Sequence, residues 1–166
     1  MTSSPVHVRR ATAADAAALA ETILAAFEEY RGALTPESGA LRETADSIAV
    51  ELEKGAAALV AERDGAIVAC VMTKSLEDDI YLGRLSVLPS ARRCGVARLL
   101  VSVIENHAQR QRAPATRLNV RVALPENQRF FASLGYVEIG RQAHPGFVEP
   151  TFILMRKTFT YCPSPI

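Results

Sequence analysis

The stretch from Ser86 to Arg98 constrains the fold of this 166-residue chain more than any other. An apolar strand runs into it, Pro89 and two arginines turn the chain, and an amphipathic helix begins at or just before Gly95. The apolar face of that helix, spaced at helical period, consists of Val96, Leu99, Leu100, Val103, Ile104 and His107. The stretch therefore predicts a strand, a turn and a helix in direct succession.

The beginning of that helix is a predicted anion site. The first N–H groups of a helix have no intrahelical partners, and the helix dipole is positive there. Gly95 allows a ligand to approach the backbone closely. The turn has one glycine and no lysine, which disfavours both the dinucleotide-binding fingerprint and the P-loop. An anion other than the ligands of those two motifs is expected.

The motif Arg92-x-x-Gly95-x-Ala97, which follows Val87-x-Pro89, resembles the acyl-CoA pyrophosphate loop of the GNAT superfamily of N-acetyltransferases. The family pattern is [QR]-x-x-G-x-[GA]. The resemblance implies acetyl-CoA as cofactor, with its pyrophosphate on the loop amides and its pantetheine arm along the preceding strand. The other interpretation is an ordinary solvated turn of two arginines in front of a helix.

The resemblance also implies which residues contact the cofactor. Arg92, Arg93 and Arg98 would add positive charge near the phosphates, including the 3′-phosphate. Cys94 would contribute its backbone, and its thiol is not expected to act as a nucleophile. The implied cofactor-binding set is Leu85, Ser86, Val87, Arg92, Arg93, Cys94, Gly95, Val96, Ala97 and Arg98.

Composition limits the remaining function classes. The formal net charge of +1 gives no overall basic field for nucleic acid or anionic lipid. The three cysteines are scattered and lack metal-ligand spacing, which favours free thiols in a reducing compartment and no metal site. No signal peptide or membrane-spanning stretch is recognised, so a cytoplasmic protein is expected.

The periodicity of the first half predicts two helices between strands. A strand at 6–11 leads into a helix ending near Tyr30, and the second helix covers about 41–54. Asp64-Gly65 predicts a hairpin that joins strands 57–63 and 66–76.

The next strand, 80–87, changes phase. Its apolar residues stand at even numbers first and at odd numbers later, which predicts a β-bulge around Gly83-Arg84. In the family that the loop resembles, the corresponding strand also carries a bulge.

The second half predicts a strand at 117–122, a short helix from Pro125 to a stop at Gly135, and closing strands at 136–144 and 152–158. Residues 160–166 are expected to form a loose tail. The whole chain is thus expected to be a single domain, 1–166, of the α/β (α+β) class. It would contain a mixed, mostly antiparallel sheet of about seven strands flanked by four helices, which is the GNAT order of elements.

Acetyl transfer to an amine requires removal of a proton. An alkylamine with a pKa near ~10.4 is neutral in about one molecule in two thousand at pH 7, which corresponds to roughly 4.6 kcal/mol. The candidate bases are Glu28, Glu29, Tyr30, Glu77, Asp78, Asp79, Tyr81 and His144.

Four of these candidates receive a predicted role. Tyr81, on the bulged strand, and His144, before the turn that overhangs the acceptor in the family, are the predicted catalytic residues. Glu28 and Tyr30 are predicted to contact the acceptor. Packing of Tyr81 and a merely exposed His144 are the competing interpretations.

The general acid of the family has no counterpart here. In the family motif Tyr-x-x-x-Gly-[Phe/Tyr] this chain has Phe131 in place of the tyrosine, followed by Gly135 and Tyr136. Phe131 is still expected near the cofactor, but it cannot donate a proton. Asn127 resembles the family asparagine that contacts pantetheine, although its spacing is shorter, and a helix-cap role is the alternative. The oxyanion donor implied by the resemblance is a backbone N–H near Val87.

The predicted function is an N-acetyltransferase that moves an acetyl group from acetyl-CoA to a primary amine of a small molecule or protein by direct attack in a ternary complex. The alternative is a fold of the same family that binds CoA without turnover, as a sensor or scaffold. A nucleic-acid module based on the arginines is disfavoured by the neutral overall charge. The acceptor and other acyl groups remain open, as does the choice between monomer and homodimer.

Overall fold

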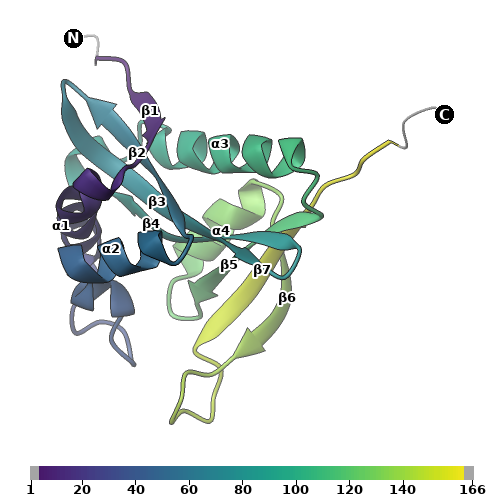
Figure 1. Cartoon of the computed structure of the whole chain (residues 1–166). Coiled ribbons are helices and arrows are strands. Elements are labelled where there is room, and N and C mark those ends of the chain that lie inside the picture. Colours follow the sequence, from purple (N-terminus) through teal and green to yellow (C-terminus); the bar gives the residue numbers. More distant parts are fainter. Residues whose placement is uncertain (1–3, 163–166) are drawn as a thin grey trace. The chain divides into compact units, whose positions relative to one another are not determined.

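The computed structural model describes residues 4–162. The predicted order of strands and helices is confirmed (Figure 1). The elements are β1 (His7–Arg10), α1 (Ala16–Phe27), α2 (Ala45–Glu53), β2 (Ala57–Arg63), β3 (Ala66–Leu76), β4 (Asp79–Val87), α3 (Val96–Arg110), β5 (Ala115–Arg121), α4 (Pro125–Ser133), β6 (Val137–Gln142) and β7 (Phe152–Thr158).

The strands form one seven-stranded sheet in the order β1-β2-β3-β4-β5-β7-β6. β4 and β5 are parallel, with Ile80 opposite Thr116 and Tyr81 opposite Arg117. The pairs β1–β2, β2–β3, β5–β7 and β6–β7 are antiparallel. α3 is the long connection that a parallel pair requires. The predicted mixed, mostly antiparallel sheet with four helices is therefore confirmed.

The chain divides into two compact units. The first comprises the residues up to Lys74 together with Leu82–Ser102, and the second comprises Ser75–Tyr81 and the residues from Val103 onward. β3, β4 and α3 each contribute to both units, because the boundaries fall within them.

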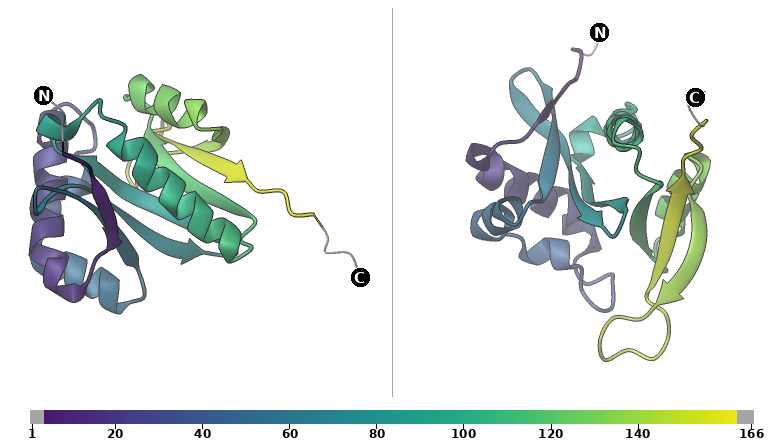
Figure 2. Two further views of the ribbon diagram at one scale, coloured as in Figure 1. Left: turned by 90° about the horizontal axis from the view of Figure 1, so that it is seen from above. Right: turned by 45° about the vertical axis from the view of Figure 1, so that its right-hand side comes forward.

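The first unit is built on an apolar cluster between α1, α2 and the strands β2 and β3. α1 and α2 pack side by side (Figures 1 and 2). Leu19, Ile23 and Ile48 are completely buried, and a buried side chain of this size contributes about 1.5–3 kcal/mol. The members of the cluster are Ala16, Leu19, Ala20, Ile23, Ala40, Ile48, Ala58, Val60, Cys70 and Met72.

The ends of α1 and α2 differ from the prediction. α1 stops at Phe27, and Glu28–Tyr30 form a separate 3₁₀ turn. α2 starts at Ala45 because Thr44 caps it: Ser47 N–H donates to Thr44 Oγ1 at 3.0 Å, and Thr44 N–H donates to Ser47 Oγ at 2.9 Å. Leu41 and Arg42, predicted as the start of this helix, belong instead to another 3₁₀ turn, Gly39–Arg42.

β4 is irregular where a bulge is predicted. Arg84 has a left-handed backbone, with φ of 53°, which a regular strand does not contain. The burial after this point differs from the prediction, since Ser86 is buried while Leu85 and Val87 are half-buried. Ser86 Oγ donates to Arg84 O at 2.9 Å, so its hydroxyl is satisfied inside the unit.

The predicted apolar face of α3 is wrong at two positions. Leu99 is 38% exposed and His107 is also exposed. The buried positions are Val96, Leu100, Val101, Ile104 and Ala108. These residues still follow the i, i+4 spacing of one helical face, so only the centre of the apolar stripe shifts.

The second unit is held together by β5, β6 and β7. Tyr136 Oη and Thr116 Oγ1 form a buried hydrogen bond of 2.9 Å, and Lys157 Nζ lies 2.8 Å from Glu105 Oε2. The strands are slightly shorter or shifted relative to the prediction: β5 begins at Ala115, and β6 covers only Val137–Gln142.

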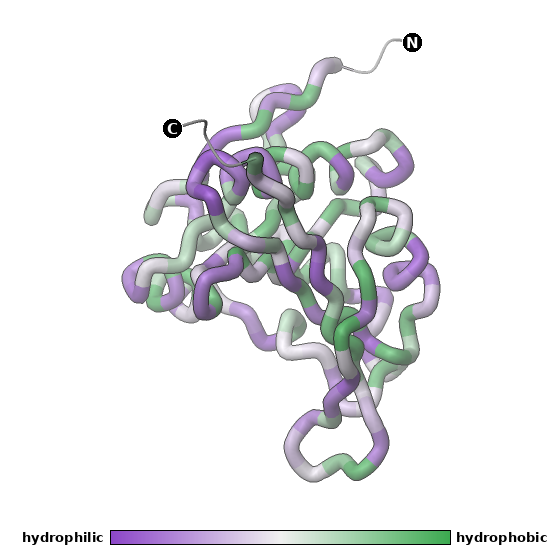
Figure 3. The backbone as a smooth tube through the Cα atoms, turned by 90° about the vertical axis from the view of Figure 1, so that its right-hand side faces the viewer, coloured by the Kyte–Doolittle hydropathy of each residue, from purple (hydrophilic) through white to green (hydrophobic). Residues whose placement is uncertain are grey.

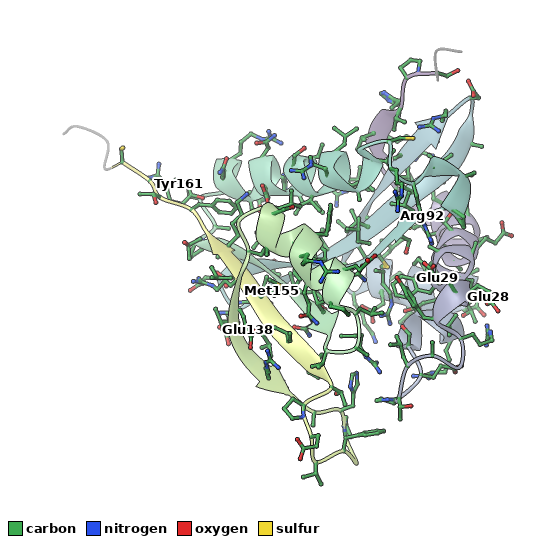
Figure 4. All side chains as sticks on the ribbon, turned by 180° about the vertical axis from the view of Figure 1, so that it is seen from behind. Glu28, Glu29, Arg92, Glu138, Met155 and Tyr161 are labelled. Atoms are coloured by element: carbon green, nitrogen blue, oxygen red, sulfur yellow. The ribbon has the colours of Figure 1, made fainter. Side chains whose placement is uncertain are left out.

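The β6–β7 loop and the C-terminal segment also belong to this unit. Phe147 and Val148 in the loop are 39% and 94% exposed, and Figure 3 shows a hydrophobic stretch at the tip of the loop. Tyr161, expected in a loose tail, donates from Oη to Ala113 O at 2.7 Å (labelled in Figure 4). The end of the expected tail, 163–166, lies outside the described residues.

Candidate functional site

The Arg92–Arg98 loop presents unpaired backbone donors at the start of α3. The first hydrogen bond of the helix runs from Leu99 N–H to Gly95 O at 2.9 Å. The backbone N–H groups of Val96, Ala97 and Arg98 therefore have no acceptor within the helix. A Cβ built on Gly95 would meet no atom within 4 Å. The surface above the helix start is therefore open to a ligand.

The sharp turn into α3 depends on two left-handed residues. Arg93 has φ of 59° and Gly95 has φ of 75°. A side chain at Gly95 would be strained in this conformation, which explains the glycine of the motif. Arg93, Cys94 and Arg98 are exposed. Cys94 Sγ donates to Arg92 O at 3.3 Å, which keeps the thiol on the loop backbone.

Arg92 behaves differently from the other two arginines. Its Nη1 lies 2.8 Å from Glu29 Oε1, its Nη2 donates to Ala26 O at 3.1 Å, and its Nε donates to Val87 O at 3.2 Å. Figure 4 shows Arg92 beside Glu29. The guanidinium group of Arg92 therefore connects the loop to α1 and β4.

The predicted acceptor residues lie at the end of α1. Glu28 is exposed and paired with Arg31, whose Nε lies 2.7 Å from Glu28 Oε1. The hydrogen bonds from Arg31 hold the pKa of Glu28 below its usual range. Tyr30 is half-buried and contacts the ring of Phe27 edge to face. The first unit thus brings Glu28 and Tyr30 into the same short turn as Glu29.

A family model decides the classification. The model of the Acetyltransferase (GNAT) family matches residues 19–136, more than half of the chain. The match includes the Arg92–Arg98 loop, β4 and the region of Phe131. The chain belongs to the GNAT family of acetyltransferases. No curated protein matches the sequence.

Solved structures share the fold of this acetyltransferase at low sequence identity. The ribosomal-protein-S18-alanine N-acetyltransferase from Escherichia coli has a TM-score of 0.77 at 16% identity, over 98% of this chain and 99% of that chain. PaiA N-acetyltransferase from Thermoplasma acidophilum, solved with coenzyme A, gives 0.74 at 15% identity, over 93% and 99%. YncA from Salmonella typhimurium, solved with acetyl-CoA, gives 0.70 at 18% identity, over 98% and 99%.

The second unit of the acetyltransferase contains the predicted catalytic residues. His144 is half-buried; its backbone N–H donates to Thr151 Oγ1 at 2.9 Å, and its Nδ1 hydrogen-bonds to the same hydroxyl. Partial burial and the positive charge of Arg121 lower the pKa of His144 below its usual value. Tyr81 is half-buried on β4, opposite Arg117 of β5.

Asp79, one of the candidate bases, forms buried ion pairs with Arg117 and Arg156. Its side chain is 2% exposed, and Arg156 Nε lies 2.7 Å from Oδ2. Arg117 Nε contacts the same oxygen. Hydrogen bonds from Arg156 and Arg117 lower the pKa of Asp79 despite its burial. A carboxylate stabilised in this way is a poor proton acceptor, so Asp79 is excluded as the base.

Phe131 and Asn127 lie on α4 in the second unit. Phe131 is 8% exposed and contacts Phe130 and Tyr136 edge to face, with ring centroids 5.0 and 5.7 Å away. Asn127 is the third residue of α4, after the N-cap Leu124. The alternative cap role of Asn127 is therefore wrong. Gln128 makes the contacts to the preceding loop instead, donating to Arg121 O and Val122 O at 3.0 Å.

Sequence reasoning missed one cluster in the first unit. Arg42 and Arg84 each place one guanidinium nitrogen close to Gly39. In the sequence Gly39 was only a loop glycine and Arg84 only part of a bulge. Arg84 is more than 40 residues away from Gly39 and Arg42 in the sequence. No periodic pattern links residues so far apart, so only the fold reveals the cluster.

No helix in the described range 4–162 is long and apolar enough to cross a membrane. Within those same residues, no three His, Cys, Asp or Glu side chains gather as a metal-binding group.

Proposed function

We propose that this acetyltransferase moves the acetyl group of acetyl-CoA onto a primary amine of a small molecule or protein, by direct attack within a ternary complex. The observation that carries the proposal is the open start of α3, with three unpaired N–H groups beside Gly95. Membership of the GNAT family supports it. Two proteins of the same fold were solved with coenzyme A or acetyl-CoA.

The residues present fit a diphosphate-bearing cofactor. The N–H groups of Val96, Ala97 and Arg98 would hold pyrophosphate oxygens, aided by the helix dipole. The exposed guanidinium groups of Arg93 and Arg98 supply charge for the phosphates. Leu85, Ser86 and Val87 offer the backbone of β4 to the pantetheine arm. When bound, acetyl-CoA would supply an activated acetyl thioester.

His144 is the preferred base. Its lowered pKa keeps the imidazole neutral at pH 7. In the tautomer whose Nδ1 donates to Thr151, Nε2 carries the lone pair that accepts the proton of the amine. Tyr81 is the second candidate, as a relay through water.

A CoA-binding protein without turnover is the second candidate function. Phe131 favours it, because a buried phenyl ring cannot donate a proton to a departing thiolate. Tyr136 does not replace the acid, since burial raises the pKa of its phenol and its hydroxyl is bonded to Thr116. A thiol with a pKa near ~8.5 is, however, a fair leaving group unaided, so we favour the enzyme.

The test is release of CoA thiol from acetyl-CoA in the presence of a panel of primary amines, with mass spectrometry of the products. Amine-dependent release with an acetylated product supports the enzyme. Binding of CoA without release for any amine supports the sensor or scaffold. Absence of both overturns the proposal.

A further inference from the structure

Two guanidinium groups lie close to Gly39. A Cβ built on Gly39 would lie 3.1 Å from Arg84 Nη2 and 3.7 Å from Arg42 Nη2. Both nitrogens are therefore within 4 Å of one point, although like charges repel each other.

The two arginines have donors to spare. Among the described residues, Arg84 makes one side-chain hydrogen bond, from Nε to Glu43 Oε1 at 2.8 Å. Glu43 in turn accepts a bond of 2.7 Å from Ser47 Oγ. Arg42 is exposed and has no hydrogen bond or ion pair in that part of the chain. Each guanidinium group has five N–H donors, so most of these donors have no partner among the described residues.

The net charge of the cluster suits a ligand group with one negative charge. Arg42 and Arg84 carry two positive charges, and Glu43 neutralises one of them. A carboxylate brings one negative charge and two oxygens, and each oxygen accepts a charge-assisted bond of about 2.8 Å. A phosphate dianion would leave an excess negative charge beside Glu43.

The backbone of β4 directs Arg84 to this place. The left-handed φ of Arg84 departs from the regular strand, and bulges of this kind re-aim a side chain. Val87, implied as the oxyanion donor, lies three residues further along the same strand, about 10 Å away at strand rise. The cluster and the reacting end of the proposed site therefore share one strand.

We infer that Arg42 and Arg84, with Gly39 between them, bind a carboxylate on the amine acceptor, so the acceptor class is amino acids and related carboxylate-bearing amines. This inference rests on the proposed function and specifies its substrate class. Arg42 and Arg84 are specificity-determining residues that bind the part of the acceptor away from the reacting amine.

The experiment compares the common L-amino acids with their α-carboxamides as acceptors, in which a neutral amide of similar shape replaces the carboxylate. Wild-type protein should acetylate the acids with a KM at least about tenfold lower than that of the matched amides. Arg42→Gln should raise KM for the acids about tenfold and leave kcat and the amide KM unchanged. Arg10→Gln, at an exposed arginine of β1 in the same unit, is the matched control and should change neither.

Gly39→Asp provides an independent variant that does not remove an arginine. Gly39 lacks a left-handed φ, so its backbone accepts a side chain, and the nearest atom is the end of a flexible arginine. The new carboxylate should pair with Arg42 and Arg84, raise the melting temperature and abolish the preference for acids. Gly39→Asn adds the same volume without the charge and should keep most of the preference. This pair decides the question if Arg42→Gln fails to fold.

Direct binding separates this inference from the proposed function. With CoA present, calorimetric titration of the amino acids and amides should show tighter binding of the acids to wild type but not to Gly39→Asp. Equal KM values, or equal affinities where turnover is absent, overturn the carboxylate site. Turnover of the amides would then still support acetyl transfer, whereas loss of CoA binding would contradict the proposed function itself.

Discussion

Arg92 Nη1 lies 2.8 Å from Glu29 Oε1, so the turn before α3 is tied to the turn after α1. The same guanidinium group donates to Ala26 O near the end of α1 and to Val87 O at the end of β4. The carbonyl end of a helix favours such a cation. Arg92 therefore anchors the Arg92–Arg98 loop to α1 and β4, while the other side of the loop remains exposed to solvent.

Arg92→Gln should destabilise the protein by about 2 kcal/mol, because two hydrogen bonds to carbonyls and a half-exposed ion pair are lost. Glu29→Gln removes only the ion pair and should cost less than about 1 kcal/mol. Urea denaturation measures both free energies of unfolding. Equal costs for the two variants would mean that the carbonyl contacts contribute nothing.

Asp79→Asn should cost about 3 kcal/mol, since it breaks a buried carboxylate away from Arg117 and Arg156. Asp78→Asn, an exposed neighbour, should stay within about 0.5 kcal/mol of wild type. The free energy of unfolding of all three proteins checks this.

The contribution of Asp79 also depends on pH. The pKa of Asp79 in the folded protein is below that of the unfolded chain, which is near ~3.9. Its stabilisation is therefore present above about pH 4 and is lost as pH falls through the folded pKa. The stability difference between wild type and Asp79→Asn should shrink in acid. A difference that stays constant with pH would contradict the ion pairs.

Local signals in the sequence predicted the fold because they act within a few residues. The stripe Leu19, Ala20, Ile23 gave α1, the Asp64-Gly65 turn gave the β2–β3 hairpin, and Pro125 gave the start of α4. The predicted start of α2 at Leu41 is wrong by four residues, because an apolar residue at this place resembles the first turn of a helix. Leu41 and its neighbour Ala40 behave differently in the structure. They are buried in a separate turn, and the Thr44 cap decides the boundary.

His144 should titrate below the usual histidine pKa of about 6.5, because partial burial and the nearby positive charge of Arg121 disfavour its protonated form. Arg121→Gln should raise the pKa. A two-dimensional NMR titration measures both values, with His144→Gln to assign the resonance. A pKa of His144 at or above 6.5 in wild type would contradict the environment described here.

Phe131→Tyr should raise kcat several-fold if the ring lies near the departing thiolate, since a phenol would stabilise charge formed mainly in the transition state. Phe130→Tyr places a phenol at the neighbouring, half-buried position of α4 and serves as the control. Steady-state kinetics measure kcat and KM for acetyl-CoA. A fall in kcat with unchanged KM would show that Phe131 only packs against Tyr136 and that another group acts as the acid.

The hydrogen bonds and ion pairs of individual side chains could not be predicted from the motif. The sequence places Arg92, Arg93 and Arg98 in one positive stretch, but Arg92 alone turns inward, because Ala26 O and Glu29 are brought to it from 66 and 63 residues earlier in the chain. The sequence makes Asp79 a candidate base, but in the structure its carboxylate is paired with Arg117 and Arg156. Such pairings depend on strand order and register, which no local pattern in the chain encodes.

The most direct test of the account is the melting temperature of the protein with and without CoA. A ligand selective for the folded state at 100 times its Kd adds about 2.7 kcal/mol, which raises the melting temperature of a chain of this size by roughly 5–10 °C. Wild type should show this shift at about 1 mM CoA, if the Kd is near ~10 μM. Gly95→Glu should abolish it, because the new carboxylate occupies the anion site.

Two further variants separate charge from strain. Gly95→Ala carries the strain of the left-handed backbone without the charge and should retain most of the shift. Gly65→Glu, at a hairpin glycine with φ of 78° and no atom within 4 Å of a Cβ, should retain all of it. These results would confirm that the start of α3 binds the cofactor. No shift in wild type, or an undiminished shift in Gly95→Glu, would contradict it.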